Sequence, residues 1–129
     1  MKLLIDEDSL GTTLLVRLQT MGHEIIRLPV GTQDEVVFAE AQRLAIPILT
    51  ANVGRKGRRD PIGLYRLAKE RIPHHGVIGI FRPAPTHQLS NQQIVEAIDR
   101  LAAQEQQQPG TALRKDDLTR LNDFLSILD

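Results

Sequence analysis

Three acids occupy consecutive positions near the start of the chain: Asp6, Glu7 and Asp8. They follow residues 2–5, an apolar run of the kind that forms a buried strand. Carboxylates this close repel one another, and a buried carboxylate without a partner is destabilising. A divalent cation compensates both effects, and hard oxygen ligands of this type suit Mg²⁺ or Mn²⁺. The sequence therefore predicts a metal site, with Asp6 as a direct ligand and Glu7 or Asp8 acting through water.

Two more polar positions follow expected strands and belong to the same edge of the sheet. Asp34 opens the helix after the second strand, and Asn52 follows the third strand. In an open parallel sheet, ligands bind outside the carboxyl ends of the strands. We therefore expect Asp6, Asp34 and Asn52 to converge as catalytic residues, with Asp34 as a second metal ligand. A metal ion held there suits the activation of water for phosphodiester cleavage.

A basic segment, "GRKGRR", comes directly after the third expected strand. Basic side chains beside a metal site can hold the phosphate backbone of a nucleic acid. A glycine-broken run of cations is also typical of a solvated loop, and the sequence leaves both interpretations open. On the first interpretation, the nucleic-acid-binding residues are Arg55, Lys56, Arg58 and Arg59.

Helix capping is the structural alternative for most of the acids. Carboxylates at helix N-termini bind free amides and interact favourably with the helix dipole. This explanation suits Asp8 with the first helix, Asp34 and Glu35 with the second, and Asp60 with the third. It does not suit Asp6, because a central strand needs no cap at its end.

Apolar strand patterns alternate with helical ones along the chain, which favours βαβ units and a parallel sheet. Thr32 and Glu35, like Ser90 and Gln93, have the spacing of a capping box. The last apolar residues, from Leu118 onwards, recur at helical spacing. The expected strands are residues 2–5, 23–28, 47–50 and 76–81, and the expected helices are 10–21, 32–46, 60–71, 90–107 and 118–128.

Composition restricts the class of protein further. A chain of 129 residues with no net charge fits a single domain without a global attraction to nucleic acid or membrane. The absence of cysteine excludes disulfides, thiolate catalysis and cysteine-ligated zinc. No apolar run approaches the ~20 residues of a membrane span, and no signal-peptide pattern precedes the first strand. We therefore expect a cytoplasmic protein with no membrane partner.

Four segments resemble the short PIN-like family, a domain of unknown function whose members often lie in toxin–antitoxin operons and are predicted ribonucleases. They are "MKLLIDEDSL", "LQTMGHEIIRLP", "TQDEVVFAEAQRLAIPILTAN" and "HGVIGIFRP". The resemblance implies an α/β three-layer sandwich with a central, mainly parallel four-stranded sheet, in which residues 1–83 form the core and 84–129 a C-terminal helical extension of the same domain. It also implies a ribonuclease toxin that uses Mg or Mn, with RNA as substrate and an antitoxin protein as partner. Asp6 and Asp34 match the first two acids of that family.

The third acid of the family has no match here. An acid normally follows the third strand within a couple of residues, and Asn52 stands at that place. An amide offers a neutral oxygen ligand but no negative charge, so divalent affinity should fall. Asp60 is an alternative ligand. A catalytically impaired PIN-like module that binds RNA or protein therefore stays open beside the nuclease.

Other classes fit the residues less well. Asp6 and Asp8 have the D-x-D form of haloacid-dehalogenase-type aspartyl phosphotransferases, but the fourth strand is not followed by acids. A receiver domain needs an aspartate where Asn52 stands. The four histidines lack the i, i+4 spacing of a zinc pair, which indicates structural or solvent-facing roles. The apolar stripes of the late helices suggest a homodimer.

Overall fold

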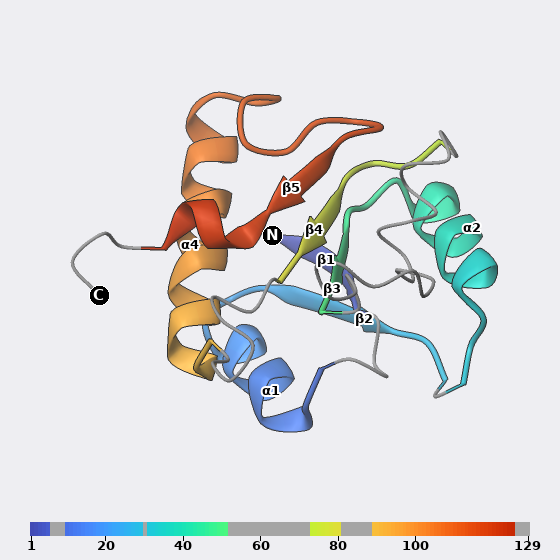
Figure 1. Cartoon of the computed structure of the whole chain (residues 1–129), viewed down its shortest axis with the longest axis horizontal. Coiled ribbons are helices and arrows are strands. Elements are labelled where there is room, and N and C mark those ends of the chain that lie inside the picture. Colours follow the sequence, from blue (N-terminus) through green and yellow to red (C-terminus); the bar gives the residue numbers. More distant parts are fainter. Residues whose placement is uncertain (6–9, 30, 52–72, 81–88, 126–129) are drawn as a thin grey trace, which may run out of the picture.

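The computed structural model describes residues 1–5, 10–29, 31–51, 73–80 and 89–125. Within these ranges the chain forms an α/β fold of five strands and three α-helices, as Figure 1 shows. The α/β class expected from the sequence is therefore confirmed. The elements are β1 (Lys2–Ile5), α1 (Thr12–Thr20), β2 (Glu24–Arg27), α2 (Asp34–Leu44), β3 (Ile48–Thr50), β4 (Val77–Gly79), α4 (Asn91–Gln107), β5 (Leu118–Arg120) and the 3-10 helix η2 (Leu121–Phe124).

The strands form one all-parallel sheet in the order β2-β1-β3-β4-β5. The chain moves outward from β1 to β2, returns across β1 to β3, and then continues in the other direction. This is a doubly wound order, in which the reversal lies between β1 and β3. Strand β1 is therefore central, with Ile5 paired with Arg27 on one side and with Leu49 on the other.

Helices cover both faces of the sheet (Figure 1). On one face, Leu3, Ile5 and Leu49 belong to an apolar cluster that includes buried residues of α1 and α4. On the other face, Leu4 and Ile48 belong to a cluster with α2. Because successive residues of a strand point to opposite faces, β1 and β3 are apolar without alternation, as expected for strands buried on both sides.

The sheet has five described strands instead of the four predicted, because residues 118–120 pair with β4 and do not begin a helix. The apolar spacing of Leu118, Leu121 and Phe124 had suggested one continuous helix. A three-residue strand followed by one 3-10 turn produces the same spacing, since the strand is too short to show alternation. Leu121 is fully buried, and the Arg100 guanidinium donates to the Phe124 carbonyl at 2.9 Å, which fastens η2 to α4.

One of the predicted capping boxes is present and the other is not. The Gln93 amide donates to Ser90 Oγ at 3.1 Å and the Ser90 amide donates to Gln93 Oε1 at 2.9 Å, which confirms the box of α4. The box of α2 was wrong: its N-cap is Gln33, and the Thr32 hydroxyl donates to the Pro29 carbonyl. The cap moves by one residue because Thr32 is engaged in the preceding turn.

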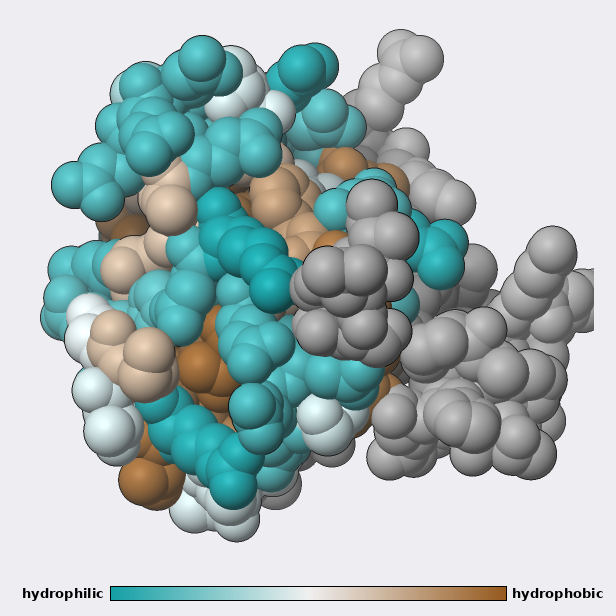
Figure 2. Space-filling model, turned by 90° about the vertical axis from the view of Figure 1, so that its left-hand side faces the viewer, coloured by the Kyte–Doolittle hydropathy of each residue, from teal (hydrophilic) through white to brown (hydrophobic). Residues whose placement is uncertain are grey.

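Figure 2 shows the side of the molecule that carries α4, and this surface is mainly hydrophilic, with apolar residues scattered between polar ones. The apolar stripe of α4 is buried within the chain by residues such as Ile94, Ile98 and Leu101. In the described part of the chain, no helix is both long enough and apolar enough to cross a membrane. The homodimer suggested by the late helices stays a prediction.

Candidate functional site

The reversal of strand order between β1 and β3 defines the candidate site. Strand β1 ends at Ile5 and β3 ends at Thr50, and these two ends are neighbours because Ile5 pairs with Leu49. Both terminal side chains are buried, Ile5 at 1% exposure and Thr50 at 0%. In doubly wound sheets, a ligand crevice opens outside the carboxyl ends of the strands at this reversal. Any ligand bound here would meet the residues that directly follow Ile5 and Thr50 in the sequence.

Of the predicted metal and catalytic residues, the structure describes Asp34. Asp34 is the first residue of α2, it is half-buried, and exposed Glu35 follows it in the first turn. The helix begins after β2, and β2 is parallel to β1, so the N-terminus of α2 follows the same carboxyl edge. An acid in the first helical turn interacts favourably with the helix dipole, whatever else it binds.

The other predicted site residues lie outside the described residues. They are the acids Asp6, Glu7, Asp8 and Asp60, the amide Asn52, and the basic residues Arg55, Lys56, Arg58 and Arg59. Their convergence on one site stays a prediction. Within the part of the chain that the structure describes, no three His, Asp or Glu side chains lie close enough together to hold a metal ion.

The start of α1 removes one structural explanation for the acidic cluster. Helix α1 begins at Thr12, and its N-cap is Gly11, without a side-chain cap. The cap predicted for this helix, Asp8, was therefore wrong, because the helix starts at Thr12, two residues later than its apolar pattern predicts. Capping of α1 thus does not account for the acid at position 8.

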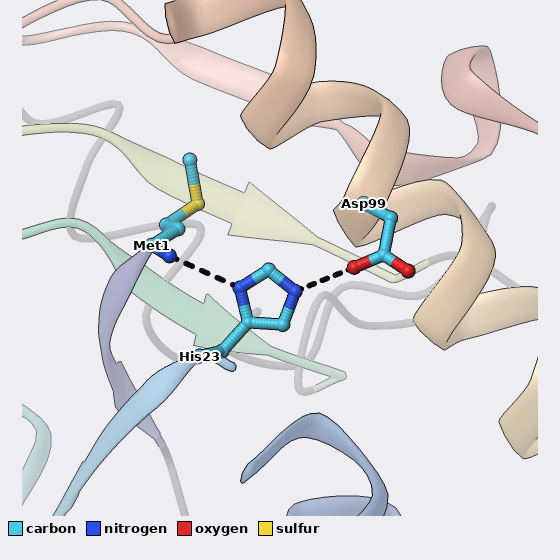
Figure 3. Close-up of polar contacts among 3 residues, drawn as sticks. All are labelled: Met1, His23 and Asp99. Atoms are coloured by element: carbon cyan, nitrogen blue, oxygen red, sulfur yellow. Dashed lines mark hydrogen bonds and ion pairs between the residues drawn. The ribbon is translucent and has the colours of Figure 1, made fainter. Parts of the chain in front are cut away.

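A chain of polar contacts lies at the opposite, amino edge of the sheet (Figure 3). His23, which directly precedes β2, has a side chain only 5% exposed. Its Nδ1 lies 3.1 Å from the amino nitrogen of Met1, and its Nε2 lies 2.6 Å from Asp99 Oδ1 on α4. The ring thus connects β1, β2 and α4. Of the structural and solvent-facing roles that the sequence left open for His23, the structure shows the first. No sequence spacing indicated that Asp99, 76 residues away, would be its partner.

His74 is the second buried histidine and precedes β4. Its side chain packs edge-on against Phe38 of α2, with ring centroids 5.7 Å apart and planes at 89°. Nδ1 accepts a hydrogen bond from the Gly76 amide at 3.0 Å. Burial holds the pKa of His74 below its usual value. The sequence left a structural or a solvent-facing role open for His74, and its burial excludes the second.

Comparison with known proteins gives no further guide. No protein-family model matches the chain, and neither a curated protein nor a solved structure is significantly similar to it. The resemblance to the short PIN-like family therefore rests on the four sequence segments and on the residues that they contain.

Proposed function

We propose that this chain is a divalent-metal-dependent ribonuclease, with its active site at the carboxyl ends of β1 and β3. One observation carries the proposal: the strand order reverses between these two strands, and their last described residues are buried neighbours. Three consecutive acids follow the first of these strands in the sequence. The densest run of acids in the sequence therefore comes directly after a strand end of the kind at which α/β sheets bind ligands.

The chemistry of the donors suits a hard divalent ion. Asp6 and Asp34 would bind Mg²⁺ or Mn²⁺, with Glu7 or Asp8 contributing through water and Asn52 offering a neutral oxygen. Bound there, the ion would supply Lewis-acid stabilisation of a phosphodiester and a lower pKa for water. The cations from Arg55 to Arg59 would hold the phosphates that flank the cleaved bond.

Two features of the described chain support this use of the acids. The N-cap of α1 is Gly11, so the acids at positions 6–8 are not required to start that helix. The strand that precedes them is central and apolar, with Leu3, Leu4 and Ile5 at 0–1% exposure. Negative charge placed directly after such a strand is destabilising unless a cation or another partner compensates it.

The test is RNA cleavage by the purified protein. With labelled single-stranded RNA and Mn²⁺, cleavage should stop on addition of a chelator, and Asp6→Asn or Asp34→Asn should lower the rate by about a hundredfold or more. Glu24→Gln is the matched control, because Glu24 is an exposed acid at the amino end of β2, the edge opposite to the site. Its cleavage rate should equal that of the unsubstituted protein.

Metal binding should be measured on the same proteins. Calorimetric titration with Mn²⁺ should detect binding that weakens in Asp6→Asn and is unchanged in Glu24→Gln. Cleavage that persists in an Asp6→Ala, Asp34→Ala double variant would refute the assignment. RNA binding without cleavage and without Mn²⁺ binding would favour the alternative, a PIN-like RNA-binding module. The resemblance adds an antitoxin protein as the partner we expect for either activity.

A further inference from the structure

The start of β4 is a junction between three elements, and the His74 side chain lies at its centre. Only 1% of His74 is exposed, and its ring contacts Phe38 of α2. The amide of Gly76, two residues later, donates to His74 Nδ1 at 3.0 Å, and the carbonyl of Gly76 accepts from the Ile48 amide of β3 at 3.0 Å. The conformation of this short turn therefore determines how β4 enters the sheet.

The same turn also forms hydrogen bonds to the two residues that directly precede β5, the last strand of the sheet. The Asp116 amide donates to the His74 carbonyl, and the His74 amide donates to Asp116 Oδ1, both at 2.8 Å. One residue further on, the Val77 amide donates to the Asp117 carbonyl at 3.2 Å. Strand β5 is an edge strand, so these bonds to residues 74–77 form the beginning of its only pairing among the described strands.

Protonation of the imidazole is incompatible with this arrangement. Because Nδ1 accepts from the Gly76 amide, the neutral ring carries its proton on Nε2. In the imidazolium form both nitrogens are donors, so Nδ1 and the Gly76 amide would face each other as two donors. Nε2 is buried, and no described residue accepts its proton. The added charge would thus gain no partner while one hydrogen bond is lost.

Gly76 leaves the turn little room to relieve that conflict. Its φ of +109° lies in the region that favours glycine. The position of a Cβ at Gly76 is 2.7 Å from Leu113 Cδ1, so the segment that precedes β5 packs directly over it. A displacement of the Gly76 amide away from a charged ring would therefore move the residues around 113–117.

The charged neighbours of the ring act in opposite directions, and burial outweighs them. Among the described residues, the carboxylates of Asp116 and Asp117 favour the imidazolium, whereas His75 disfavours it. Burial in the apolar environment lowers the pKa of His74 below the ordinary value of about 6.5. The hydrogen-bonded joint between residues 74–77 and residues 116–117 therefore takes up a proton at lower pH when it is closed than when it is open.

We propose that His74 is a proton-operated latch for β5: the neutral ring holds the joint between β4 and β5 closed, and a charged ring releases the edge strand. The device needs no ligand and is independent of the proposed nuclease site. Its sign follows from linkage. Between the pKa of an opened, solvated histidine and the lowered pKa of the closed joint, the open form binds more protons, so acidification favours opening.

Native-state amide exchange measured by NMR between pH 7 and pH 5 tests the proposal. Protection factors remove the intrinsic pH dependence of exchange. Protection at Val77 and Asp116, whose amides bond across the joint, should fall by up to about tenfold for each pH unit below the histidine pKa, as expected for uptake of one proton. Protection at Leu4, which bonds to Pro47 on the β1–β3 side, should change little. Equal loss at Leu4 and Val77, or no loss at Val77, would overturn the proposal.

Two variants separate the latch from general acid sensitivity. Asp116→Asn retains an oxygen that can accept from the His74 amide but removes a carboxylate that favours the imidazolium. The closed form of this variant should therefore take up its proton only at still lower pH, so the loss of protection should begin at the same pH but continue further and become larger in total. His74→Phe cannot take up a proton, so protection at Val77 should no longer depend on pH, although it will be lower throughout because Gly76 loses its acceptor. His75→Gln, at the half-buried neighbour, should retain the transition.

Each variant result has a contradicting outcome. A loss of protection on acidification of Asp116→Asn that is no larger than in the unsubstituted protein, or one that persists in His74→Phe, would exclude His74 as the titrating group. If His74→Phe does not fold, the size of the loss of protection in Asp116→Asn decides the question, because that variant keeps both the imidazole and an acceptor oxygen.

Discussion

Single residues decide how the strands of this sheet are joined, and Gly76 is the clearest example. It combines a positive φ, a buried amide that binds His74, and direct packing against Leu113. The sequence shows a glycine at position 76 but does not show whether the positive φ, the hydrogen bond or the close packing requires it. The same is true of His74, for which the sequence left a structural or a solvent-facing role open without revealing that its ring packs on α2 and its backbone bonds to Asp116.

Gly76→Ala should destabilise the protein by about 1–3 kcal/mol, since an L-residue at positive φ is strained and its Cβ would also displace Leu113. Urea unfolding followed by circular dichroism measures the effect. Gly110→Ala is the matched control: its φ is +84°, but no atom lies within 4 Å of the added Cβ. It should cost less than Gly76→Ala, and an equal loss would show that packing against Leu113 contributes nothing.

At the scale of elements, sequence patterns located helices and strands well where local chemistry dominates. The capping box of α4 was predicted correctly because Ser90 and Gln93 bind each other's backbone without tertiary help. The N-terminus of α2 was misplaced because the Thr32 hydroxyl donates to the Pro29 carbonyl of the preceding turn. That of α1 was also misplaced, since its N-cap is Gly11 without a side-chain cap. Strand β5 was missed because its existence depends on the unpaired edge of β4, which lies about forty residues earlier in the chain.

The two predicted capping boxes give a direct comparison. Ser90→Ala removes the acceptor for the Gln93 amide and should lower the free energy of unfolding by about 1 kcal/mol. Thr32→Ala removes only an exposed bond to the Pro29 carbonyl and should change it by about 0.5 kcal/mol or less. Thermal or chemical unfolding of the two variants measures both values. A larger loss for Thr32→Ala would contradict the assignment of Gln33 as the N-cap of α2.

At the scale of the whole molecule, the two edges of the sheet have different chemistry. The amino edge is closed by the chain of contacts from Met1 through His23 to Asp99, which joins β1 and β2 to α4. The carboxyl edge carries the strand reversal and the proposed site. The sequence predicted a parallel α/β sheet and the edge at which acids should gather. It also predicted that Asp6, Asp34 and Asn52 converge at that edge, and this stays a prediction because Asp6 and Asn52 lie outside the described residues.

His23→Phe should lower the free energy of unfolding by about 1–3 kcal/mol, because the ring is buried and both of its hydrogen bonds would be lost. Asp99→Asn retains an acceptor oxygen for Nε2 and should cost less. Denaturant unfolding measures both, with His75→Gln as the control at a half-buried histidine outside this chain of contacts. A loss for His75→Gln as large as that for His23→Phe would show that the bridge between the sheet and α4 adds no stability.

The two apolar clusters also differ in when their parts are synthesised. Among the described residues, the face covered by α2 is assembled mainly from the first fifty residues, with Val77 and the partly buried Leu118 as the later additions. The opposite face needs residues 94–101 of α4 and Leu121 before Leu3, Ile5 and Leu49 are covered. A nascent chain that has left the ribosome only as far as β3 therefore already carries most of the described apolar residues of one side of its sheet, whereas the other side still lacks α4. Until α4 is translated, that second side stays exposed. Chaperones would bind it, or other unfinished chains would associate through it.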